Sequence, residues 1–105
     1  MSRFSATKYG NKKTDGYASK AEARRGADLR LLERAGEISD LREQVSYEII
    51  PKQAGERAVH YVCDFAYTQR GALVVEDVKG VKTRVYILKR KLMKLVHGIT
   101  IREVA

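Results

Sequence analysis

The sequence has one cysteine, one proline and no tryptophan. The single cysteine, Cys63, excludes an intramolecular disulfide and any zinc site built from several cysteines. No apolar run approaches the roughly 18 residues that a membrane-spanning helix needs, and the N-terminus lacks the apolar core of a secretion signal. We therefore expect a protein that does not enter a membrane and that works in a reducing cytoplasm.

Acidic residues are outnumbered by basic ones, 13 against 21, which gives a net charge of +8. Residues 1–34 carry nine basic and four acidic side chains, residues 35–75 carry four and six, and residues 76–105 carry eight and three. Two basic flanks thus surround a slightly acidic middle. This distribution favours a polyanionic partner, most commonly nucleic acid, whereas the alternative is a basic protein with solvated lysines.

Residues 1–17 are polar and include Lys12 and Lys13. The composition predicts a flexible basic arm that precedes a single domain over residues 18–105. Such an arm would either follow a phosphate backbone or remain a disordered tail.

Hydrophobic periodicity predicts six elements in the order α-β-β-β-α-β. Ser19 and Glu22 form a capping box that begins the first helix, and apolar residues at helical spacing after Gly80 predict the second. The expected ranges are a helix over 20–35, strands over 41–50, 58–67 and 72–79, a helix ending at 97, and a strand over 99–104. We expect one α/β (α+β) domain with a mixed central sheet.

Strict alternation within the expected strands assigns side chains to faces. In the first strand one face carries the apolar residues Leu41, Val45, Tyr47 and Ile49. In the second strand one face carries Val59, Tyr61, Cys63, Phe65 and Tyr67.

Charged residues interrupt two neighbouring apolar strands. Asp64 stands in an apolar run, although aspartate is depleted in strands, and the hairpin neighbour carries Glu76, Asp77 and Lys79. Alternation places Asp77 and Lys79 on one face and Glu76 on the other. Two carboxylates beside a lysine suit a hard divalent cation such as Mg²⁺, with the lysine orienting a water. A structural ion pair is the alternative.

This pattern resembles the signature of the PD-(D/E)XK nuclease superfamily, whose core has the same α-β-β-β-α-β order. The resemblance covers about residues 17–104 and is stronger to short phage-associated proteins, endonuclease-like or Holliday-junction-resolvase-like, than to other members. The stretches that carry it are Ser19–Ala23, Leu41–Gln44, Asp64–Phe65, Asp77–Gly80, Lys82–Thr83 and Tyr86–Lys89.

The resemblance implies a role for each matching residue. Asp64 and Asp77 match the metal-binding acids, and Lys79 matches the lysine that positions or activates the attacking water. Glu22 matches the acid that many members supply from the first helix, although it would equally serve only as part of the helix cap. Gln44 is a softer match to a polar neighbour of the site. The signature has proline where this chain has Cys63.

We therefore expect an endonuclease that uses Mg²⁺ or Mn²⁺ to hydrolyse DNA phosphodiester bonds in a bacterial or phage-infected cell. Branched or recombination DNA is the expected substrate, and a homodimer would suit cleavage of two strands. The alternatives are a non-catalytic DNA-binding or scaffold protein on the same fold and an RNA-directed nuclease. The residues expected to grip nucleic acid, unless they form only a solvated surface, are Lys82, Arg84, Tyr86, Lys89, Lys91, Lys12 and Lys13.

Overall fold

The computed structural model describes residues 19–105. The expected N-terminal arm, with Lys12 and Lys13, lies outside the described residues. Within residues 19–105 no helix is long and apolar enough to cross a membrane.

The two helices begin and end at residues that suit those positions. Helix α2 spans Lys20–Arg34, and the Ser19 hydroxyl accepts a hydrogen bond from the Glu22 backbone N–H at 3.1 Å. Helix α3 spans Arg84–His97 and is capped in the same way by Thr83. It ends at Gly98, whose φ of +69° is readily adopted only by glycine. Helix α2 and the end of α3 confirm the sequence-based expectation to within one residue.

The two long strands expected over 41–50 and 58–67 are each broken in two. The first becomes β1 (Ser39–Glu43) and β2 (Ser46–Ile50), and the second becomes β3 (Val59–Val62) and β4 (Phe65–Gln69). Gln44 has a φ of +54° at the first break. The two breaks face each other, because the Gln44 N–H donates to the Asp64 carbonyl and the Cys63 N–H donates to the Val45 carbonyl.

The breaks make the expected face assignment wrong. Tyr61 and Cys63 pack in one core, whereas Phe65 and Tyr67 pack in another. Leu41 is likewise separated from Ile49. Period-2 alternation holds only along an unbroken strand, so a bend in both partners moves the following residues to the opposite face.

The strands form a four-stranded sheet in the order β1-β4-β5-β6 and a separate ribbon of β2 and β3. Strand β5 (Ala72–Val78) pairs antiparallel with β4, and β6 (Arg102–Val104) pairs parallel with β5. The sheet is mixed, as expected, because it contains both antiparallel and parallel pairs. Helix α3 connects the two parallel strands, and the chain forms a single small α+β domain.

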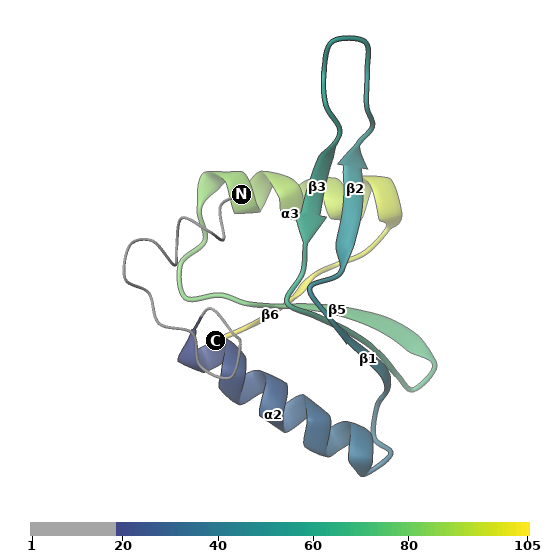
Figure 1. Ribbon diagram of the computed structural model, residues 1–105, viewed down its shortest axis with the longest axis vertical. Coiled ribbons are helices and arrows are strands. Elements are labelled where there is room, and N and C mark those ends of the chain that lie inside the picture. Colours follow the sequence, from purple (N-terminus) through teal and green to yellow (C-terminus); the bar gives the residue numbers. More distant parts are fainter. Residues whose placement is uncertain (1–18) are drawn as a thin grey trace.

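Helices α2 and α3 lie on opposite sides of the strands (Figure 1). The α2 side buries one core, made of Ala23, Leu29, Ile38, Phe65 and Tyr67. The α3 side buries a second core, made of Ile49, Tyr61, Cys63, Ala66, Val75, Tyr86, Met93 and Ile101. Consecutive residues of β5 therefore enter different cores, which decides the surroundings of Glu76 and Asp77.

Candidate metal and catalytic site

Asp64 lies in the break between β3 and β4 rather than in the middle of a strand. Its backbone N–H donates to the Glu76 carbonyl at 3.2 Å, and its carbonyl accepts from the Gln44 N–H at 3.1 Å. Its side-chain Oδ2 accepts from the Val78 N–H at 2.8 Å. The break explains why an aspartate is tolerated here, and these three bonds fix its carboxylate against the end of β5.

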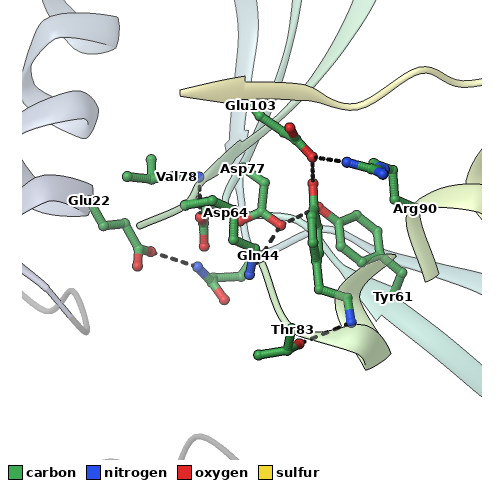
Figure 2. A network of polar contacts seen from close by, with 11 residues as sticks. Glu22, Gln44, Tyr61, Asp64, Asp77, Val78, Thr83, Arg90 and Glu103 are labelled. Carbon is green, nitrogen blue, oxygen red and sulfur yellow. Dashed lines mark hydrogen bonds and ion pairs between the residues drawn. The ribbon is translucent and has the colours of Figure 1, made fainter. Parts of the chain in front are cut away.

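Asp77 places a second carboxyl beside the first. Figure 2 shows the two side chains near each other at the centre of a polar network. Burial of Asp77, which is 4% exposed, and the neighbouring Asp64 carboxyl raise its pKa to about 7. The Tyr61 hydroxyl opposes this by donating to Asp77 Oδ2 at 2.6 Å.

Lys79 completes the group that alternation predicted on this face. Its Nζ lies 3.7 Å from Asp77 Oδ2 and 4.4 Å from the centroid of the Tyr86 ring. A cation above an aromatic face is attracted by the negative face of the ring. The ammonium group is therefore held between a carboxylate and a ring, and its side chain remains 28% exposed.

The Tyr86 ring is itself held by the last strand. Its hydroxyl donates to Glu103 Oε2 at 2.6 Å, and Arg90 contacts the same oxygen at 2.9 Å (Figure 2). These bonds lower the pKa of Glu103 to about 2. Lys82 also pairs with Glu103, at 3.3 Å. Neither Glu103 nor the role of Tyr61 was predictable from the sequence, because both depend on strands that meet only in the folded chain.

Glu22 approaches from α2 and is connected to the site through Gln44. It is 5% exposed, and its Oε2 accepts from Gln44 Nε2 at 2.9 Å. Residues 19–105 contain no group of three His, Cys, Asp or Glu side chains arranged to hold a metal ion. Glu22 thus lies beside Gln44 on the α2 side, and its expected role as a third metal ligand stays a prediction.

The acid pair nevertheless fits a divalent cation by its chemistry. Two buried carboxyls beside each other are unfavourable when both are negatively charged, because like charges repel each other. A divalent cation neutralises both charges, and Mg²⁺ retains several waters in sites that supply only one or two carboxylates. Asp64 and Asp77 are the residues that would hold it.

Glu76, next in the chain to Asp77, lies on the other face of β5. It is fully buried and accepts two hydrogen bonds from Arg25, at 2.9 and 2.8 Å. The Tyr67 hydroxyl donates to the same carboxylate at 3.0 Å. The pairing raises the pKa of Arg25 above its usual range. Glu76 thus anchors α2 to the sheet, and sequence alternation had correctly separated it from Asp77.

The residues expected to grip nucleic acid fall into two groups. Lys82, Arg84 and Lys91 are exposed and Lys89 is half-buried, all of them in α3 or just before it. Tyr86 is only 6% exposed, and its hydroxyl is engaged by Glu103. The structure therefore places Tyr86 beneath Lys79 rather than on a surface that a phosphate could reach.

The chain belongs to the family described as "Protein of unknown function (DUF1064)", whose model matches residues 1–102. No curated protein matches the chain. No solved structure matches it either.

Proposed function

We propose that this member of the DUF1064 family is a divalent-metal-dependent endonuclease that hydrolyses DNA phosphodiester bonds. The observation that carries the proposal is the buried pair of Asp64 and Asp77 with the Lys79 ammonium 3.7 Å from Asp77. Two buried carboxylates close to each other lower the stability of a fold unless a cation neutralises them. Such a pair is therefore expected where it serves a function. Strongly raised carboxyl pKa values gather at functional sites for this reason.

Each residue of the site has a defined role in the proposed reaction. Asp64 and Asp77 hold Mg²⁺ or Mn²⁺, which when bound polarises a phosphoryl oxygen and lowers the pKa of a water. Lys79 orients the attacking water and offsets the negative charge that develops on the phosphate. Tyr61 holds the Asp77 carboxyl, and the Tyr86 ring holds the Lys79 ammonium. Gln44 and Glu22, which hydrogen-bond to each other, are polar neighbours of the site on the α2 side.

The resemblance to the PD-(D/E)XK superfamily supports this reading. The superfamily signature combines two acids and a lysine; here Asp64 directly precedes β4, Asp77 lies in β5, and Lys79 directly follows β5. Branched or recombination DNA is the substrate that the likeness to junction resolvases suggests. The exposed basic residues in and before α3 supply backbone contacts, which position a substrate without reading its sequence.

Cleavage assays on the purified full-length protein test the proposal. Plasmid, linear duplex, a four-way junction and single-stranded RNA are each incubated with Mg²⁺, Mn²⁺ or EDTA. We expect metal-dependent DNA cleavage that falls roughly 1,000-fold in Asp77→Asn, comparable to the loss of a strong transition-state contact.

Arg70→Gln serves as the matched control, because Arg70 is an exposed residue at the turn between β4 and β5, away from the acid pair. Cleavage that persists in EDTA or in Asp77→Asn would contradict the mechanism. DNA binding without cleavage of any substrate would favour a non-catalytic DNA-binding protein, and cleavage of RNA alone would redirect the proposal to RNA.

A further inference from the structure

Helix α3 exposes an apolar surface that the proposed nuclease activity does not use. Most of the large hydrophobic side chains exposed in residues 19–105 lie in or just before this helix, namely Val81 at 78%, Val85 at 64%, Leu88 at 58%, Leu95 at 80% and Val96 at 51%. Another face of the same helix buries Tyr86 and Met93 in the core. Within residues 19–105, α3 thus has two apolar faces, and the core covers only the face that carries Tyr86 and Met93.

Three exposed residues and one half-buried residue follow the spacing of a helix–helix seam. Val85, Leu88, Leu92 and Leu95 are separated by three, four and three residues, which is the a/d pattern of a coiled coil. Leu92 is the half-buried one, because it packs against the core on the α3 side. We call these four residues the α3 seam. Helices that lie on membranes present a broad apolar face, whereas an a/d pattern is a narrow stripe that suits one facing helix. The seam therefore favours a helix as its occupant.

The charges beside the seam restrict what that helix is. By helical geometry Arg84 and Lys91 flank the seam on one side and Lys89 flanks it on the other. The sequence of α3 contains no acidic residue. Pairing with the same helix from a second copy would bring these basic flanks together, which disfavours association. Acidic residues at the flanking positions of the occupant would pair with them.

We propose that the α3 seam docks an amphipathic helix of a partner protein whose flanking positions are acidic. The interaction combines burial of the leucines with ion pairs to Arg84, Lys89 and Lys91, and the charges select the partner. The apolar seam occupies a different face of α3 from Tyr86, whereas its basic flanks Arg84, Lys89 and Lys91 are also residues proposed above to contact DNA.

Binding of two synthetic helices to the full-length protein tests the proposal. Both labelled peptides have three heptads with Leu at a and d, and they differ only in carrying Glu or Lys at e and g. We expect fluorescence anisotropy to show binding of the Glu peptide and not of the Lys peptide. Leu88→Asp should weaken that binding about 30-fold, as for an interface hot spot. Arg84→Glu/Lys89→Glu/Lys91→Glu should reverse the preference between the two peptides.

Leu31→Asp is the matched control, because Leu31 in α2 is 57% exposed, close to the 58% of Leu88, and lies outside the seam. It should bind the Glu peptide as the unmodified protein does. Equal binding of both peptides, or of neither, would overturn the proposal. So would a dimer in sedimentation experiments that Leu88→Asp dissociates, or binding to phosphatidylglycerol vesicles that Leu88→Asp abolishes.

Discussion

Glu76 and Asp77 are adjacent in β5 and both are buried, but the two faces of the sheet surround them differently. On the α2 face, Arg25 and Tyr67 donate three hydrogen bonds to the Glu76 carboxylate. On the α3 face, Asp77 lies beside the Asp64 carboxyl, accepts one hydrogen bond from Tyr61 at 2.6 Å, and has the Lys79 ammonium group 3.7 Å away. The fold pairs the first carboxylate with a bidentate arginine, whereas it places the second beside another acid.

This difference separates a structural acid from a functional one. A buried carboxylate with a bidentate arginine holds two elements together. A buried carboxylate beside another carboxylate adds little to the stability of the fold, and it is the arrangement that a cation would complete. Burial alone does not distinguish the two residues, but the charge of their nearest neighbours does.

The largest expected effect is on stability, and it has opposite signs at the two positions. Glu76→Gln leaves Arg25 without its counter-charge and should lower the free energy of unfolding by about 3 kcal/mol. Asp77→Asn removes one of two like charges and should raise it by about 1 kcal/mol, as replacements of functional residues often do. Urea unfolding at pH 8 in EDTA measures both. A loss of stability in Asp77→Asn as large as in Glu76→Gln would contradict the comparison.

The pH dependence of stability should report Asp77. Because its folded pKa of about 7 lies above the ordinary value of 3.8, its contribution to stability is full below about pH 4 and is lost as the pH rises through 7. Glu103, whose pKa is lowered to about 2, acts in the opposite direction but only at lower pH. The metal-free protein should therefore lose stability between about pH 4 and pH 7. Asp77→Asn should flatten this slope, and an unchanged slope would argue against the assignment.

Tyr61 sharpens the comparison, because its hydroxyl favours the ionised form of Asp77. Tyr61→Phe removes the 2.6 Å hydrogen bond and should raise the pKa of Asp77 further. We expect Mn²⁺ binding to weaken about 10-fold, the usual scale for partners of metal ligands, with its pH midpoint moved upward. Calorimetric titration across pH values measures both quantities. Tyr47→Phe is the control, since Tyr47 lies on the same ribbon. A weaker affinity with an unmoved midpoint would indicate a merely structural role.

The smallest effect concerns the ring beneath Lys79. Tyr86→Phe keeps the aromatic face 4.4 Å from the ammonium group, whereas Tyr86→Leu removes it. The leucine variant should lose about 5-fold more cleavage activity than the phenylalanine variant, the size of one cation–π contact. Circular dichroism at increasing temperature shows whether both variants remain folded at the assay temperature. Equal activity in the two folded variants would rule out a role for the ring.

Alternation along β5 was sufficient to predict that Asp77 and Lys79 share a face and that Glu76 faces away. The same rule failed in the neighbouring hairpin, where Gln44 and Asp64 interrupt both strands. The low tendency of aspartate to lie within strands was the available signal for a break at Asp64. The sequence gives no comparable signal at Gln44, because its positive φ follows from the way the two strands bend together.

Local patterns determined the two helices, the Ser19 cap of the first, the element types and the candidate residues Asp64, Asp77 and Lys79. These features depend on spacing within one segment, and a sequence records that spacing directly. Only the tertiary structure decided that Arg25 lies opposite Glu76, that Tyr61 donates to Asp77, and that Glu103 fixes the ring beneath Lys79. These contacts join residues far apart in the chain, so they exist only once the sheet and both helices have packed.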